Sequence, residues 1–245
     1  MEVSKKVVFI KDWILNYANS MPKKAQSLVI GASGGIDSSV TSTLCAMTGI
    51  KTIVLSMPIK QKNTQHDLSL KHQDWLKKNY NNVESHIIDL DKLFSEFKSS
   101  LSNFDNDHGM ANSRARLRMT TLYQVASSNN GIVVGTGNKV EDFGVGFYTK
   151  YGDGGVDISP IADCNKSEIW ELGKELNLLK EIIDAPPTDG LWDDGRTDES
   201  QLGLTYKELE EAMENEKSIN RDKYLKIRKT SLHKMQQIPV CKIPK

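Results

Sequence analysis

The stretch SLVIGASGGIDSSV, residues 27–40, joins a short apolar run to a pair of glycines and then to a helical pattern. The apolar run, residues 27–32, has the length and composition of a buried strand. Apolar side chains then recur at spacings of four and three, which predicts a helix over residues 37–48 that ends before Gly49. The stretch therefore predicts a strand, a glycine-rich turn and a helix in succession.

The same alternation of strand and helix continues along the first half of the chain. Three more short apolar runs predict strands, and the segments between them have the spacing of amphipathic helices. Short apolar strands that alternate with helices are typical of a parallel sheet covered on both faces. We therefore expect an α/β fold, a three-layer sandwich in which helices flank a parallel sheet. The expected strands are residues 27–32, 52–57, 85–90 and 132–136, and the expected helices are residues 3–18, 37–48, 64–80, 91–99, 112–128, 166–178, 205–214 and 218–235.

The composition argues against several classes of protein. The 245 residues include 32 basic and 32 acidic side chains, so the formal net charge is zero and a nucleic-acid binder that works through bulk charge is disfavoured. No apolar run approaches the roughly 18 residues of a membrane span, and residues 1–19 lack the pattern of a signal peptide. The three cysteines show no paired spacing, which favours reduced thiols and a cytoplasmic location. We expect a single domain over residues 1–245, with no membrane and no nucleic-acid partner.

Charge is uneven along the last part of the chain. Residues 181–216 hold twelve acidic and two basic side chains, whereas residues 217–245 hold nine basic and one acidic. Two interpretations are open: solvated helix faces that pack against each other, or a basic segment that faces an anionic ligand.

The turn at residues 33–38, Ser-Gly-Gly-Ile-Asp-Ser, has the chemistry of an anion-binding site. Its glycines let backbone N–H groups approach an anion closely, and the following helix offers its free N–H groups and the positive end of its dipole. Asp37 adds a carboxylate that could ligate a Mg²⁺ ion bridging phosphates. Neither the Walker A spacing nor the dinucleotide fingerprint occurs here. The segment resembles instead the pyrophosphate loop of ATP pyrophosphatases, enzymes that cleave ATP to AMP and pyrophosphate.

A second polar motif, VGTGNKVE at residues 134–141, overlaps the end of the fourth expected strand. Ligands of open α/β sheets bind at the carboxyl ends of the strands, so Thr136 and Glu141 are expected near the phosphate loop. Mg²⁺ usually takes one or two carboxylates together with phosphate oxygens and water. Asp37 and Glu141 are therefore the expected metal ligands.

Three further motifs distinguish among the ATP pyrophosphatases. They are NSRARLRM at residues 112–119, GFYTKYGDGGVD at residues 146–157 and SLHKMQQIP at residues 231–239. Together with the two motifs above, they resemble ammonia-dependent NAD synthetases over residues 3–239. The resemblance implies an adenine nucleotide alpha-hydrolase-like fold, a homodimer, and ATP-dependent amidation of deamido-NAD with ammonia. That reaction passes through a carboxyl-adenylate, gives NAD, AMP and pyrophosphate, and is the final step of NAD biosynthesis.

The resemblance also implies roles for individual residues. Lys166 is expected to neutralise phosphate charge during catalysis, and Asp157 to take a proton from ammonium near the nicotinate end. An alternative role for Asp157 is to cap the turn that follows two glycines. The ATP contacts are expected at Gly31, Ala32, Ser33, Gly34, Gly35, Ile36, Asp37, Ser38, Thr136, Lys166 and Thr188. The deamido-NAD contacts are expected at Arg116, Lys150, Asp157, His233 and Lys234.

Two other functions compete with this interpretation. A tRNA-modifying ATP pyrophosphatase is disfavoured by the neutral charge and by the lack of a catalytic cysteine pair. A non-catalytic nucleotide-binding module would not need Asp37, Glu141 and Lys150 together. Free ammonia is expected as the nitrogen source, because the first strand begins near residue 27 and a glutaminase domain does not fit before it. The polar segment 185–204 is expected either to close over the adenylate as a lid or to form a surface loop.

Overall fold

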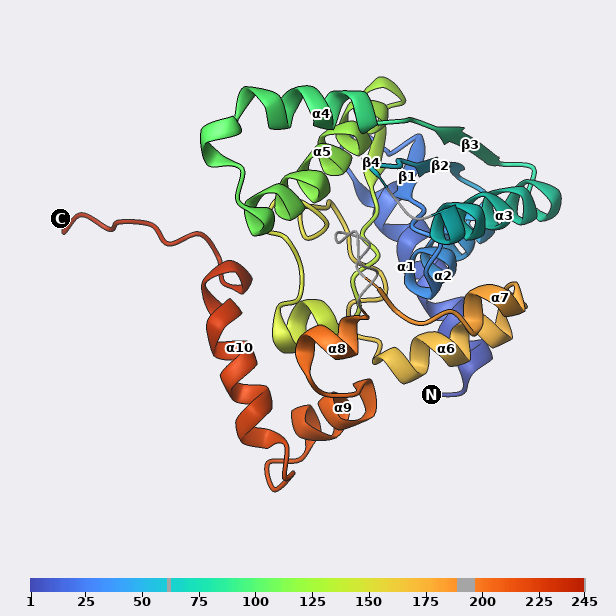
Figure 1. The fold of residues 1–245 in the computed structure, drawn as a ribbon. Helices are drawn as coiled ribbons and strands as arrows, with labels where there is room; N and C mark the ends of the chain where they lie inside the picture. The colour runs from blue at the N-terminus through green and yellow to red at the C-terminus, as the bar shows by residue number, and fades with distance from the viewer. Residues whose placement is uncertain (61–62, 189–196, 245) are drawn as a thin grey trace.

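A parallel four-stranded sheet lies at the centre of the fold (Figure 1). The computed structural model describes residues 1–60, 63–188 and 197–244. The strand order is β3-β2-β1-β4, and each neighbouring pair is parallel. The strands are β1 (Ser27–Gly31), β2 (Lys51–Ser56), β3 (Val83–Ile87) and β4 (Gly131–Val133).

Helices cover both faces of this sheet, which confirms the expected α/β sandwich of three layers. One face carries α1 (Val3–Ser20), α2 (Ile36–Met47), α3 (Asn63–Asn79) and α6 (Lys166–Glu175), and the other carries α4 (Asp91–Ser100) and α5 (Asp107–Ser128). Successive strand residues point to opposite faces. In β1, Leu28 and Ile30 pack with α1, α2 and α6, whereas Val29 packs with α4 and α5. All three side chains are fully buried, so β1 lies in the core between the two helical layers.

The chain connections open a crevice between β1 and β4. From β1 the chain passes through α2 to β2 on one face, and it returns to β4 through α4 and α5 on the other face. The loops that follow β1 and β4 therefore diverge at their carboxyl ends, the place where open α/β sheets bind ligands.

A second group of helices packs beside the sheet rather than on it (Figure 1). Its members are the π-helical segment η2 (Lys139–Val145), α8 (Asp198–Leu202), α9 (Tyr206–Glu214) and α10 (Arg221–Met235), while the short α7 (Lys180–Ile183) and η1 (Ser102–Phe104) lie elsewhere. Val140, Leu209 and Tyr224 lie in its buried core, and Trp170 of α6 packs against it. This group, the C-terminal helical cluster, thus rests on α6 at the side of the crevice.

Several element ends differ from the sequence predictions for local reasons. The helix expected from residue 112 begins at Asp107, because the Asn106 side chain accepts a hydrogen bond from Gly109 N–H and caps it earlier. The strand expected to reach residue 136 ends at Val133. Beyond it, Val134 forms only an isolated bridge with Ile158.

Two other element ends also differ from the prediction, and one helix was not expected. The helix expected to reach residue 178 ends at Glu175, and Asn177 has a left-handed φ of 54°. The expected helix over residues 218–235 starts at Arg221, and α8 interrupts the polar segment 185–204. Residues 189–196 of that segment, the centre of the expected lid, lie outside the described residues.

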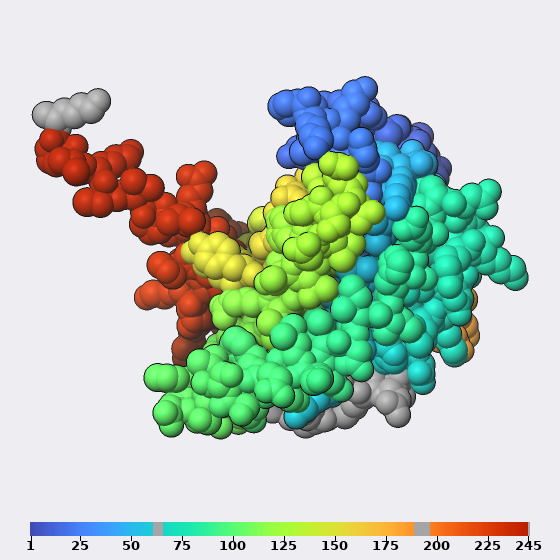
Figure 2. Space-filling model, turned by 90° about the horizontal axis from the view of Figure 1, so that it is seen from above, coloured from blue at the N-terminus to red at the C-terminus, as the bar shows by residue number. Residues whose placement is uncertain are grey.

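The C-terminal residues after α10 extend away from the body of the molecule in both views (Figures 1 and 2). Ile238, Val240 and Ile243 on this segment are largely exposed. Across the described residues, no helix combines the length and the apolar character that crossing a membrane requires.

Candidate active site

A cavity of about 530 Å³ lies at the carboxyl ends of β1 and β4. Its wall combines the loop after β1, the first turn of α2, one side of α5, the segment after β4 and the start of α6. Most residues expected from the sequence line this one cavity: Gly31, Ala32, Ser33, Gly34, Gly35, Ile36, Asp37, Ser38, Arg116, Thr136, Glu141, Lys150, Lys166, Thr188 and Lys234.

The phosphate loop holds its own hydroxyl groups in place. Gly34 has a left-handed φ of 89°, which glycine adopts without the penalty of a Cβ atom. Ser33 Oγ lies 3.0 Å from Ser38 Oγ and accepts a hydrogen bond from Gly35 N–H at 3.1 Å. Ser38 Oγ in turn donates to the Gly35 carbonyl at 3.0 Å. Hydroxyl donors therefore stand beside the N-terminus of α2, where an anion is stabilised.

Lys166 joins the two predicted metal carboxylates. Its Nζ lies 2.6 Å from Asp37 Oδ2 and 2.8 Å from Glu141 Oε1. The lysine is 1% exposed and is the first residue of α6, where Asn165 and Glu168 form a capping box that fixes the helix start. Burial opposes the charge on Lys166, but the two carboxylates outweigh it and raise the lysine pKa above its ordinary value.

The two carboxylates differ in how they titrate. Burial raises the pKa of Asp37, and the charge of Glu141 adds to this against the opposing effect of Lys166. For Glu141, burial acts in the same direction, but Lys166 and hydrogen bonds from Tyr206 and Asn138 outweigh it and lower the pKa. Glu141 is thus the more firmly ionised member of the pair.

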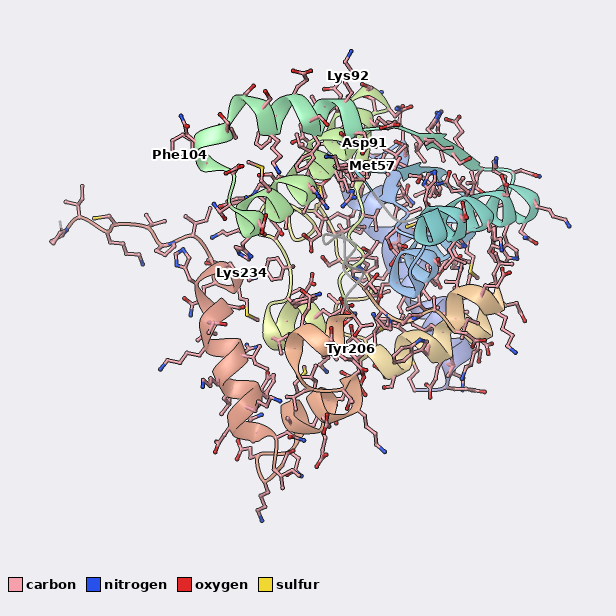
Figure 3. The ribbon with its side chains drawn as sticks, in the orientation of Figure 1. Met57, Asp91, Lys92, Phe104, Tyr206 and Lys234 are labelled. Atoms are coloured by element: carbon pink, nitrogen blue, oxygen red, sulfur yellow. The ribbon has the colours of Figure 1, made fainter. Side chains whose placement is uncertain are left out.

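Neutral donors support both carboxylates. Asn138 is fully buried, and its Nδ2 donates to Asp37 Oδ1 at 2.9 Å. The same side chain caps η2 by accepting from the N–H groups of Val140 and Glu141. The Tyr206 hydroxyl donates to Glu141 Oε1 at 2.6 Å. Figure 3 shows Tyr206 at the junction of η2, α6 and α8.

The arrangement suits a divalent cation. The Lys166 ammonium already lies within hydrogen-bonding distance of both carboxylates, so a cation in that space would contact both. Among the described residues, no group of three or more His, Cys, Asp or Glu side chains could hold a metal alone. Phosphate oxygens and water would therefore complete the coordination, as is usual for Mg²⁺.

Basic and aromatic side chains form the opposite wall. Arg116 Nε donates to the Lys150 carbonyl at 3.2 Å, which ties α5 to the loop after η2. Lys234, which is labelled on α10 in Figure 3, donates from its Nζ to the Tyr148 carbonyl at 2.6 Å. The same Nζ lies 5.0 Å from the centre of the Tyr148 ring. Burial lowers the pKa of Lys234, against the opposing charges of two nearby aspartates, Asp153 and Asp142. Cationic groups thus face the cavity from α5, α10 and the intervening loop.

Two predicted residues do not line the cavity. Asp157 Oδ2 accepts from Val133 N–H at 2.7 Å, and its Oδ1 accepts from the Tyr123 hydroxyl at 3.0 Å. Burial and this hydrogen bond raise the Tyr123 pKa to about 12. Asp157 therefore links the end of β4 to α5, and both of these contacts lie outside the glycine turn that it was expected to cap. His233 lies next to Lys234 on α10 but outside the cavity wall.

The sequence reasoning missed four polar residues near this chemistry. Asp142 and Asp153 line the cavity, and burial followed by neighbouring carboxylates raises the pKa of Asp142 well above its ordinary range. Asn138 could have been found from its helix-capping position before Lys139. Tyr206 gave no comparable signal, because its contact with the site spans 65 residues.

Comparisons with known proteins show what this chain is similar to. A family model described as NAD synthase matches residues 6–242. The NH(3)-dependent NAD(+) synthetase of Carboxydothermus hydrogenoformans is 38% identical over 192 residues, which is 76% of each chain.

Two solved structures also align over almost the whole chain. A structure of NMN synthetase from Francisella tularensis superposes with a TM-score of 0.89 at 31% identity, covering 99% of this chain and 100% of that one. An NH3-dependent NAD synthetase from Campylobacter jejuni in complex with nitrate superposes with a TM-score of 0.79 at 25% identity, with the same coverage of both chains.

Proposed function

This chain belongs to the NAD synthase family, and from that membership we propose how its cavity works. The chain is an ammonia-dependent ligase that forms a carbon–nitrogen bond: it amidates deamido-NAD to NAD, the final step of NAD biosynthesis. ATP is the co-substrate. The observation that carries the assignment to this cavity is the Asp37–Lys166–Glu141 group beside the phosphate loop.

We propose that Asp37 and Glu141 bind Mg²⁺ once ATP is present. The cation would neutralise the phosphates and leave Lys166 free to contact them. The loop N–H groups, Ser33 and Ser38 would hold the pyrophosphate that leaves. Their hydroxyls now bond to one another and to Gly35, so they can exchange these contacts for phosphate oxygens without moving far.

The substrate carboxylate must be activated before ammonia can attack it. A carboxylate is a poor electrophile, so its oxygen first attacks the α-phosphorus of ATP and pyrophosphate leaves. Ammonia then attacks the carbonyl carbon of the carboxyl-adenylate, the bond to the phosphate oxygen breaks, and the amide and AMP result. The cationic wall of Arg116, Lys150 and Lys234 supports binding of an anionic second substrate there.

Ammonium must lose a proton before it attacks. Asp157 stays a prediction for this role, but its carboxylate is occupied by Val133 and Tyr123 outside the cavity wall. Asp153 lines the cavity, and its Oδ1 accepts from Thr149 N–H at 3.0 Å. We propose Asp153 as the better-placed acceptor.

A second candidate substrate rests on one comparison. The solved structure with a TM-score of 0.89 is named an NMN synthetase, which implies amidation of a mononucleotide rather than a dinucleotide. Both substrates present a nicotinate carboxylate and at least one phosphate, so the same cationic wall suits either. Relative kcat/KM values for deamido-NAD and nicotinate mononucleotide decide between them.

The deciding experiment measures products. The purified chain is given ATP, Mg²⁺ and either deamido-NAD or nicotinate mononucleotide, with ammonium or glutamine as nitrogen donor. We expect amide, AMP and pyrophosphate in equal amounts with ammonium and deamido-NAD, and no amide with glutamine. Formation of ADP and phosphate would contradict the proposed chemistry, and a higher kcat/KM for the mononucleotide would favour the second candidate.

We also propose a homodimer in the cytoplasm. The homodimer follows from the family resemblance and is supported by exposed apolar side chains on α1. All three cysteines are unpaired, and Cys241 is exposed as a free thiol, which suits a reducing compartment.

A further inference from the structure

Tyr206 is the buried tyrosine that contacts the proposed metal site. It is 3% exposed, and its hydroxyl lies 2.6 Å from Glu141 Oε1 and 3.1 Å from Asp198 Oδ2. A phenol hydroxyl has one proton and can donate it to one acceptor at a time. The shorter distance identifies Glu141 as the acceptor, so the proton serves the carboxylate that also binds Lys166.

The tyrosine ring is fixed from two sides. Thr205 and Glu208 form a capping box that sets the start of α9, and Tyr206 is the next residue. Its ring packs edge-on against Trp170 of α6, with centroids 5.9 Å apart and planes at 87°. The Lys166 ammonium lies 4.9 Å from the centre of the same ring. The capping box and the Trp170 contact thus orient the hydroxyl toward Glu141 without using a residue of the phosphate loop.

We propose that Tyr206 is a positioning residue that holds the Glu141 carboxylate in place for the divalent cation. The proposal rests on the metal site given under Proposed function. Lys166 now holds both carboxylates, but it must release them when a cation takes its place and the phosphates attract it. Asn138 then still holds Asp37, and Tyr206 holds Glu141. Without the hydroxyl, Glu141 would keep only Asn138 as a neutral donor when the cation binds, and its carboxylate would be less firmly oriented.

The test compares two tyrosine variants. Tyr206→Phe removes the hydroxyl and keeps the ring against Trp170. Tyr224→Phe is the matched control: Tyr224 is 5% exposed in the same helical cluster, but its hydroxyl donates to the Gly144 carbonyl at 3.3 Å rather than to a carboxylate. Mn²⁺ binding is measured by electron paramagnetic resonance in the presence of a non-hydrolysable ATP analogue. We expect Tyr206→Phe to weaken Mn²⁺ binding about tenfold or more, the range seen when a partner of a metal ligand is removed.

Two further readouts separate positioning from general destabilisation. In Tyr206→Phe, the Mg²⁺ concentration for half-maximal rate should rise, while the rate at saturating Mg²⁺ returns toward that of the wild type. The melting temperature without metal should fall in both tyrosine variants, because each loses a buried hydroxyl contact, so a lower melting temperature alone does not distinguish them. Tyr224→Phe should bind Mn²⁺ like the wild type.

The outcomes test the role of Tyr206 separately from the proposed metal site. If Tyr206→Phe binds Mn²⁺ as tightly as the wild type, or Tyr224→Phe weakens binding equally, the positioning role is wrong. The variant Asp37→Asn tests the metal site itself. If it binds Mn²⁺ like the wild type, the proposed metal site fails whatever Tyr206 does.

Discussion

At the scale of single residues, His72 shows how burial alone changes a side chain's chemistry. Its ring is 1% exposed, and its Nε2 shares a hydrogen bond of 2.8 Å with Ser42 Oγ behind the phosphate loop. Its Nδ1 has no hydrogen-bond partner among the described residues. Burial lowers the pKa of His72 to about 4. The folded protein therefore keeps this ring neutral under conditions in which an exposed histidine takes up a proton.

This pKa predicts a fall in stability on mild acidification. Because the folded pKa lies below the ordinary value of 6.5, the unfolded chain binds the proton more readily between these values. The contribution of neutral His72 is thus complete above pH 6.5 and is lost as the pH falls toward 4. The loss amounts to at most about 3 kcal/mol. We expect His72→Gln to flatten the pH dependence of the urea unfolding midpoint across this window.

The control for this experiment is His86→Gln. His86 is half exposed at the sheet edge, so its replacement should leave the slope of the wild type unchanged. If His72→Gln keeps the same slope between pH 6.5 and 4, some other group causes the acid sensitivity, and the role given to His72 is wrong.

Residue spacing alone predicted the site residues that lie in local motifs, whereas Lys166 and Lys234 were expected only from the family resemblance. Ser33, Asp37 and the glycines between them act within six positions, so their spacing reveals an anion site. By contrast, Asn138 reaches Asp37 across 101 residues and Tyr206 reaches Glu141 across 65. Contacts of that kind depend on how elements distant in the sequence pack together, such as η2 beside α2 and α9 beside α6, and a single sequence does not specify this packing.

At the scale of elements, η2 and α10 pack closely against each other at Gly146. Gly146 ends η2 with a left-handed φ of 70°. A Cβ atom there would lie 2.5 Å from Ser231 Cβ and 2.8 Å from Met235 Sδ. The two elements can approach this closely only because residue 146 has no side chain, and the approach sets the position of Lys234 on α10.

Gly146→Ala should therefore lower the free energy of unfolding and also weaken substrate binding. The left-handed backbone costs an alanine about 1–2 kcal/mol. Overlap with α10 adds about 1–3 kcal/mol. We expect urea unfolding to show the sum of both effects, and the KM for deamido-NAD to rise because Lys234 shifts with α10.

The matched variant is Gly49→Ala. Gly49 has a φ of 78°, but a Cβ atom added to it would meet nothing within 4 Å, so this variant should lose only the backbone contribution and keep the wild-type KM. If the two variants are destabilised equally, α10 adjusts to the added methyl group at no cost. If the KM of Gly146→Ala is unchanged, the contact at Gly146 does not set the position of Lys234.

The elements themselves were predictable to different degrees. Four parallel strands and the helices between them followed from apolar runs and helical spacing, since these patterns reflect which faces are buried. The early start of α5 followed from Asn106, a cap that lies outside the apolar pattern. The short π-helical η2 was not among the expected helices, because its start depends on the Asn138 cap and its end on the glycine contact with α10.

At the scale of the whole molecule, the excess of basic side chains near the C-terminus lies partly on α10, where two arginines bind neighbouring helix ends. Arg221 donates to the carbonyls of Ala212 and Met213 at the end of α9, and Arg228 donates to those of Phe143 and Gly144 at the end of η2. Cations are stabilised at helix C-termini. Lys234 of the same helix lines the cavity. The basic segment thus packs against neighbouring helices through their carbonyl groups, and the role of Lys234 toward an anionic substrate stays a prediction.

The last prediction concerns assembly. Phe9 and Trp13 are 61% and 40% exposed one turn apart on α1, and Trp13 stacks on the partly exposed Tyr17. An apolar stripe of this kind favours burial against another chain. The chain has a mass of 27.5 kDa, so we expect sedimentation of the wild type at twice that mass and of Phe9→Glu at the monomer mass. Phe104→Glu is the control, since Phe104 is 73% exposed on η1, a separate surface (Figure 3). A wild-type monomer would refute the homodimer. Dissociation by Phe104→Glu alone would place the interface on the α4–α5 side instead of on α1.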